Sequence, residues 1–135
     1  MRFISMVKSA EANAAPPPKA FLDAMGRLTE EVAKAGCVMI QAEGLLPTPT
    51  GARVRLADSK VTVTDGPFTE AKEVVGGFAI FEVQSKAQIL DVARRFLDLH
   101  KIHIPGWEGE IELRQIAWPG EKLCAQAFET EAAAV

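Results

Sequence analysis

The residues best suited to chemistry form the short stretch Asp65-Gly66-Pro67-Phe68, which separates two apolar runs. Glycine and proline favour a sharp backbone turn, which would hold the Asp65 carboxylate at the end of a strand. Inside a partly apolar cleft, such a carboxylate can act as a general base. The structural alternative is that Asp65 accepts backbone N–H groups and only stabilises the turn. The residues alone favour this structural role, and the two roles are compatible.

Charged side chains near this stretch are candidates for substrate binding. Glu70 and Lys72 lie two residues apart in the polar segment 69–73 and could hold a small polar molecule near Asp65. Arg53 and Arg55 lie on one side of a predicted strand, and guanidinium groups suit bidentate binding of a carboxylate or phosphate. Each pair also has a simpler interpretation, as a solvated turn and as exposed side chains of a hairpin.

The histidines and cysteines do not form a recognisable metal site. His100 and His103 have the spacing H-x-x-H in residues 100–107, which we expect to be a loop because of their proline and glycine. Zinc would need at least one more ligand, and the spacing places none. The two histidines could instead be bases near neutral pH or part of an irregular surface. Cys37 and Cys124 support neither a disulfide framework nor a zinc site, so we predict no cofactor.

The composition is that of one ordinary globular domain. The chain has 135 residues, of which 48% are hydrophobic and 24% charged, enough for a single substantial core. Its formal net charge of −3 gives no sign of the basic face that nucleic-acid binding requires. No run approaches the ~20 apolar residues of a membrane span. We therefore expect a cytoplasmic protein with no nucleic-acid or membrane partner.

The hydrophobic pattern predicts the order strand, helix, strand, hairpin, strand, helix, strand. Residues 2–8 and 77–83 are apolar on both faces, as in strands covered on both sides. Residues 37–41 form a second strand, and residues 42–51 are expected to be a loop. Apolar residues recur at spacings of three and four within 19–34, which indicates a helix.

The second half of the chain gives more specific signals. Ser85 followed by Gln88 is typical of a capping box, and we expect the helix it opens to end before His100. Residues 110–118 form the last strand, where a change of parity between Leu113 and Ile116 suggests either a bulge or a strand whose two ends are covered by different elements. The hairpin comprises residues 53–56 and 61–63 around a turn at 57–60. Its inward-facing side chains are expected to be Val54, Leu56, Val61 and Val63.

Without the inserted hairpin, this order is that of a ferredoxin-like α+β sandwich, with two helices on one face of an antiparallel sheet. Two helices can cover only one face, yet two strands are apolar on both. Exposing the second face would be costly, so we predict a homodimer in which a second copy covers it. Residues 1–118 would form the domain, followed by a tail at 119–135 in which a short helix is one interpretation.

Residues 64–73 together with Gly77-Phe78 resemble the signature of the DGPF proteins within the YCII-related group. The resemblance extends to residues 24–36, 43–45 and 110–115, although Leu46 stands where relatives often carry a histidine. It implies a ferredoxin-like subunit that pairs as a dimeric α+β barrel. An Asp–His pair in a cleft has suggested enzymatic activity for the wider group. DGPF proteins also accompany extracytoplasmic-function sigma factors, which implies a regulatory association.

Two functions therefore remain open. The first is a cofactor-free acid–base enzyme that acts on a small molecule, with Asp65 as proton acceptor and the nearby Arg or Lys side chains binding the substrate. The alternative is a non-catalytic module that binds a small molecule or a partner and has a regulatory role. An open cleft with convergent polar groups beside Asp65 would favour the enzyme, whereas a cleft filled by side chains would exclude it.

Overall fold

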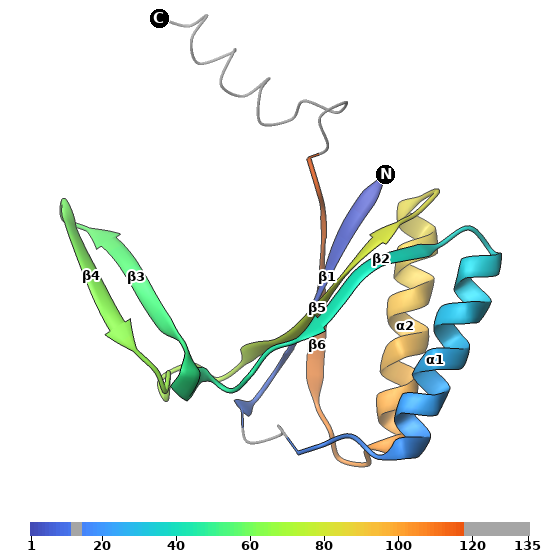
Figure 1. Cartoon of the computed structure of the whole chain (residues 1–135), viewed down its shortest axis with the longest axis horizontal. Helices are drawn as coiled ribbons and strands as arrows, with labels where there is room; N and C mark the ends of the chain where they lie inside the picture. The colour runs from blue at the N-terminus through green and yellow to red at the C-terminus, as the bar shows by residue number, and fades with distance from the viewer. Residues whose placement is uncertain (12–14, 118–135) are drawn as a thin grey trace, which may run out of the picture.

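The computed structural model describes residues 1–11 and 15–117. The order of elements is β1 (Arg2–Ser9), α1 (Lys19–Lys34), β2 (Val38–Gly44), a 3-10 turn η2 (Thr48–Thr50), β3 (Ala52–Ala57), β4 (Lys60–Asp65), β5 (Val74–Glu82), α2 (Lys86–His103) and β6 (Gly109–Gln115). Four strands form an antiparallel sheet in the order β2-β5-β1-β6, and β3 pairs only with β4. The predicted ferredoxin-like α+β architecture is confirmed, with the hairpin inserted between β2 and β5 (Figure 1).

Helix α1 occupies the range that the apolar stripe predicted. The Pro18 carbonyl oxygen accepts the backbone N–H of Phe21 at 3.0 Å, so the proline immediately precedes the first turn. Gly36 has a φ of +93° just past the last turn, a conformation that glycine adopts without steric cost. These two residues explain why the helix begins and ends where it does.

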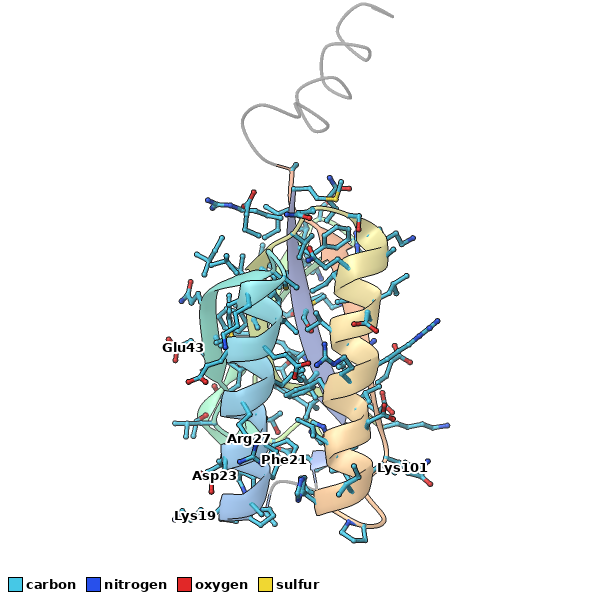
Figure 2. All side chains as sticks on the ribbon, turned by 90° about the vertical axis from the view of Figure 1, so that its right-hand side faces the viewer. Lys19, Phe21, Asp23, Arg27, Glu43 and Lys101 are labelled. Carbon is cyan, nitrogen blue, oxygen red and sulfur yellow. The ribbon has the colours of Figure 1, made fainter. Side chains whose placement is uncertain are left out.

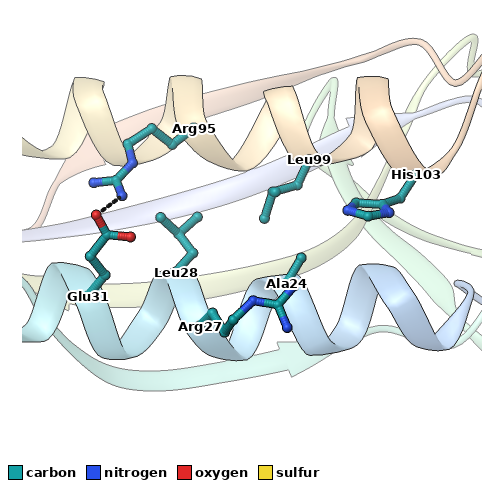
Figure 3. A pocket seen from close by; sticks show the side chains of 7 residues that line it. All are labelled: Ala24, Arg27, Leu28, Glu31, Arg95, Leu99 and His103. Atoms are coloured by element: carbon teal, nitrogen blue, oxygen red, sulfur yellow. Dashed lines mark ion pairs between the residues drawn. The ribbon is translucent and has the colours of Figure 1, made fainter.

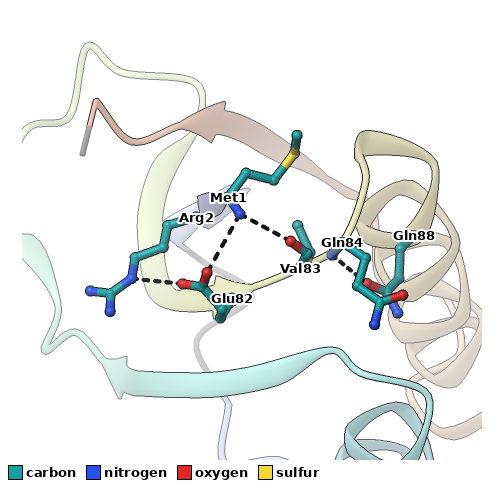
Figure 4. Close-up of polar contacts among 6 residues, drawn as sticks. All are labelled: Met1, Arg2, Glu82, Val83, Gln84 and Gln88. Carbon is teal, nitrogen blue, oxygen red and sulfur yellow. Dashed lines mark hydrogen bonds and ion pairs between the residues drawn. The ribbon is translucent and has the colours of Figure 1, made fainter. Parts of the chain in front are cut away.

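Helix α2 starts at a cap that also joins the two helices. The Ser85 hydroxyl oxygen accepts the backbone N–H of Gln88 at 3.1 Å, as predicted. The Gln88 side chain accepts the backbone N–H of Gln84 at 2.9 Å (Figure 4). It also donates to the carbonyl oxygen of Ala35 at 2.8 Å. The glutamine thus reaches one residue beyond the serine and connects the start of α2 to the end of α1.

The core lies between the two helices and one face of the sheet. The helices run antiparallel and side by side over that face (Figures 1 and 2). Cys37 is only 1% exposed and is a small core residue, as expected. The buried cluster consists of Phe3, Leu28, Val32, Cys37, Val83, Ile89 and Val92.

The opposite face of the sheet has no helix over it in the described part of the chain (Figure 1). The register pairs Ile4 with Ile80 and Met6 with Phe78. Because successive residues of a strand point to opposite faces, these four side chains lie on the face opposite Phe3. They are half-buried within the single chain. We call them the open face.

The hairpin of β3 and β4 projects from the sheet on the side away from the helices (Figure 1). Asp58 and Ser59 have φ values of 51° and 62°, as a two-residue type I′ turn requires, so the predicted hairpin is confirmed. The prediction that its apolar side chains face inward is wrong for the single chain, because no layer within residues 1–11 and 15–117 packs against the hairpin. These side chains are between 67% and 72% exposed and comprise Val54, Leu56, Val61 and Val63.

Two other boundaries differ from the sequence prediction. Strand β2 extends to Gly44, since residues 42–44 continue to pair with β5 instead of forming a loop. Helix α2 continues through His103 instead of ending before His100, because the first helix-breaking residue after it is Pro105. Both histidines are therefore helical.

The last strand has no bulge. Strand β6 pairs with β1 in an unbroken register from Gly109 to Gln115, and Ile116 lies beyond its end. The bulge alternative is therefore wrong for residues 109–115, whereas the other alternative, a strand whose ends are covered by different elements, stays a prediction. Trp118 and the tail at 119–135 lie outside the described residues.

Candidate functional site

The turn after β4 is held by close backbone packing. Asp65 is the last residue of β4, and the Gly66–Pro67 peptide bond that follows is cis. The Gly66 N–H donates to the carbonyl oxygen of Gly51 at 2.9 Å. A Cβ atom on Gly66 would lie 1.7 Å from the carbonyl oxygen of Thr48, so only glycine fits here. The turn is therefore packed directly against η2.

A carboxylate from a distant part of the chain holds the same turn. The Phe68 N–H donates to Thr48 Oγ1 at 3.2 Å, and Thr48 Oγ1 donates to Glu11 Oε2 at 2.7 Å. The Thr48 backbone N–H donates to the other oxygen of Glu11. Glu11, just after β1, thus fixes η2, and η2 fixes the turn. The sequence prediction did not identify Glu11 or Thr48, because no motif connects residues so far apart in the chain.

The Asp65 carboxylate itself is exposed and has no hydrogen-bond or ion-pair partner within residues 1–11 and 15–117. Among these residues, the Asp65 carboxylate therefore accepts no backbone N–H group, contrary to the structural alternative in which it holds the turn. Thr48, Gly51 and Glu11 hold the turn instead. Asp65 is a free carboxylate on a fixed piece of backbone.

Two of the four predicted binding residues contact each other. Arg53 Nη1 forms an ion pair with Glu70, and the Arg53 guanidinium lies 3.9 Å from the centre of the Phe68 ring. The pKa of Glu70 is lowered, first by a hydrogen bond from its own backbone N–H and then by Arg53. Both side chains are largely exposed, so the pair orients the loop after the turn more than it stabilises the protein.

The predicted acid and the two arginines do not converge. In the β3–β4 register Asp65 pairs with Ala52, on the hairpin face of Val54 and Val63, whereas Arg53 and Arg55 lie on the other face. Arg55 and Lys72 are exposed and have no ion pair with any described residue. Among the four predicted binding residues, only Lys72 both lies in the segment that follows the turn and has no ion pair with a described residue.

The open face is bordered by charged pairs. Lys8 Nζ lies 3.1 Å from carboxylate oxygens of both Glu110 and Glu112 on β6. These two acids raise the pKa of Lys8, Glu112 having the larger effect. The same lysine lowers the pKa of Glu112. An apolar centre with a charged margin is the composition of a protein interface.

A second group of charges lies at the other end of the same face. Glu82 accepts from Arg2 Nε at 2.8 Å and lies 3.4 Å from the N-terminal amine of Met1 (Figure 4). The pKa of Glu82 is lowered, chiefly by the hydrogen bond from Arg2. The amine also donates to the carbonyl oxygen of Val83 at 3.1 Å, so the chain start is held at the sheet.

Helix α2 places the two histidines in different surroundings. His103 borders a cavity of about 290 Å³ between the helices, whose polar margin includes Arg27 and the ion pair of Arg95 with Glu31 at 2.8 Å (Figure 3). His100 is only 6% exposed and packs among aromatic rings. Within the described residues, no group of three or more His, Cys, Asp or Glu side chains is placed to hold a metal ion.

Neither α1 nor α2 is long and apolar enough to cross a membrane, and the same holds for every other helical segment of the described chain.

The antiparallel sheet, the helix pair on one face and the inserted hairpin define a ferredoxin-like α+β protein. The family model of the YCII-related domain matches residues 1–96, which include the Asp65 turn. The chain therefore belongs to the YCII-related family. It is similar to an uncharacterised protein of Rhizobium meliloti (strain 1021), with 36% identity over 102 residues that span 74% of this chain and 75% of the relative.

Proposed function

We propose that the protein is a homodimer that binds a small molecule beside the Asp65 turn of each subunit, and that Asp65 accepts a proton from that molecule. One observation carries this proposal: Asp65 is a carboxylate without a partner among the described residues, on a backbone turn fixed by Thr48, Gly51 and Glu11. A catalytic base needs this combination of a fixed position and an available lone pair.

The open face supports the dimer. Its apolar centre of Ile4, Met6, Phe78 and Ile80 has charged margins formed by Lys8 with Glu112 and by Arg2 with Glu82. The hairpin projects on the same side of the sheet and adds four exposed apolar side chains (Figure 1). Exposed apolar side chains gathered in this way support an interaction site in a soluble protein. A second copy is the proposed partner because the resemblance to DGPF proteins implies paired sheets.

The proposed chemistry uses few groups. Asp65 would remove a proton from a small molecule held between the turn and the second subunit. Arg53 is engaged by Glu70 and Arg55 lies on the other hairpin face, so Lys72 is the best candidate to bind an anionic end of the substrate. No cofactor is needed for proton transfer of this kind.

A second candidate function is a non-catalytic binding module with a regulatory role. This binding module is favoured because Asp65 is not among the lining residues of either of the two cavities described for the single chain. In that case the turn is a recognition surface, and the association of DGPF proteins with extracytoplasmic-function sigma factors indicates the regulatory setting.

The test is a comparison of Asp65→Asn with Asp58→Asn, which makes the same charge change at the far end of the same hairpin. A turnover found by substrate screening should be lost only in Asp65→Asn, while the melting temperatures of both variants stay near that of the parent. Ligand binding that survives in Asp65→Asn without any turnover in the parent would favour the binding module. A large loss of melting temperature in Asp65→Asn alone would mean that Asp65 is structural.

A further inference from the structure

We propose that the cavity beside His100 is a binding site for a small neutral aromatic molecule with one hydroxyl or N–H donor, of the size of phenol. The cavity has a volume of about 210 Å³ and lies where the end of α2 meets the start of α1. A dry apolar cavity of about 150 Å³ is enough to hold benzene. Its main lining residues are Pro16, Pro18, Phe21, His100, Ile104 and Trp107.

Among these residues, the His100 ring and the indole N–H of Trp107 are the strong hydrogen-bonding groups of the side chains. Its Nδ1 lies 3.0 Å from the carbonyl oxygen of Phe96. Since a carbonyl can only accept, Nδ1 carries the proton and Nε2 is left as an acceptor in the neutral ring. Burial lowers the pKa of His100, which favours this neutral form.

The Nε2 atom is available to a ligand. It forms no hydrogen bond with the described residues, and among these residues no buried side-chain nitrogen or oxygen is left without a partner. Nε2 is therefore not completely enclosed, although the residue as a whole is only 6% exposed. The proposal places Nε2 on the part of the wall that His100 lines, where a donor on a bound molecule would reach this nitrogen.

Aromatic rings fix both the histidine and the shape of the cavity. The Trp107 ring centre lies 4.2 Å from that of His100, and the Phe21 and Phe96 ring centres each lie 4.7 Å from it. Trp107 packs against Gly109, where a Cβ would lie 2.3 Å from its ring. Because prolines are conformationally restricted, the segment that forms the other wall loses little entropy on binding. The walls therefore suit a flat, apolar ring.

The site shares no residue with the Asp65 turn, so this proposal stands independently of the proposed function. The simpler alternative is that His100 only contributes to packing. The cavity would then take up apolar molecules without a hydrogen bond to Nε2. Toluene distinguishes the two, because it has the size of phenol but no donor.

The experiment titrates the full chain with phenol and with toluene, following the 15N chemical shifts of the His100 ring. Phenol should bind saturably, shift the Nε2 resonance and bind about tenfold more tightly than toluene, the factor for about 1.4 kcal/mol of hydrogen bonding. His100→Phe should remove this preference while leaving the fold intact. His103→Phe is the matched control, because His103 borders the other cavity, and it should leave phenol binding unchanged.

Absence of phenol binding, equal binding of phenol and toluene, or an unmoved Nε2 resonance on saturation would each overturn the proposal. If His100→Phe fails to fold, the comparison of the two probes on the parent protein still decides, because it needs no variant.

Discussion

Replacement of Gly66 by alanine should dislodge the turn that carries Asp65. The added Cβ would lie 1.7 Å from the Thr48 carbonyl oxygen and 2.5 Å from its carbon, both of which are backbone atoms that no rotamer change can move away. The turn must shift by more than an ångström, which breaks the bond from Gly66 to Gly51 and the bond from Phe68 to Thr48. At roughly 0.5–1.5 kcal/mol for each hydrogen bond, we expect a loss of about 1–3 kcal/mol.

Hydrogen exchange measures this effect where it occurs. The Gly66 and Phe68 amides should be protected in the parent and exchange faster by one to two orders of magnitude in Gly66→Ala, in line with that loss of free energy. The matched control is Gly26→Ala on the surface of α1, where a Cβ meets nothing within 4 Å. It should stabilise the protein by about 1 kcal/mol and leave both amides unchanged. Unchanged protection of the Phe68 amide in Gly66→Ala would refute the packing argument.

Three further predictions concern the helices and the core. Ser85→Ala should destabilise the protein by about 1 kcal/mol in urea unfolding, since it removes the cap bond to Gln88, and an unchanged midpoint would contradict this. In a Cys124→Ser background, Cys37 should react with a thiol reagent only as fast as the protein opens. The reason is that the Cys37 side chain is 1% exposed and that burial raises the pKa of its thiol. Rapid labelling of the native protein would be inconsistent with that burial. Burial also lowers the His100 pKa below its unfolded value of about 6.5, so the unfolded chain binds the proton first and stability should fall as the pH drops through that value. His100→Gln should remove this part of the pH dependence in urea unfolding, and an unaltered profile would count against it.

The regular parts of the fold could be predicted because local signals determine them. The apolar stripe of α1, the cap at Ser85 and the turn at Asp58-Ser59 each depend on residues close together in the chain. The sequence predicts too early an end for α2, because the proline and glycine that indicate a loop lie beyond His100 and the first helix-breaking residue is Pro105. The prediction that the apolar side chains of the hairpin are buried is wrong, because the alternation of apolar and polar residues shows which side chains share a face. It does not show whether anything covers that face.

The candidate site was predicted only in part. The DGPF turn and its glycine were identified, and Arg53 does contact Glu70. Glu11 and Thr48 were not found, because their contacts with the turn are made across a large separation in sequence. Asp65 is separated from both arginines because it shares the hairpin face of Val63, whereas Arg53 and Arg55 lie on the other face. The predicted hairpin has this register but ends at Val63, so it does not include Asp65. Long-range packing therefore decides which of the predicted side chains can act together.

We propose that a second copy covers the open face and completes the site at Asp65. Sedimentation equilibrium of the full chain at micromolar concentration tests it most directly. A mass of twice the 14.6 kDa of the chain, held on dilution through that range, is the predicted result. A mass of 14.6 kDa would contradict the account, because the open face and the apolar hairpin would then remain without the partner on which the proposed site depends.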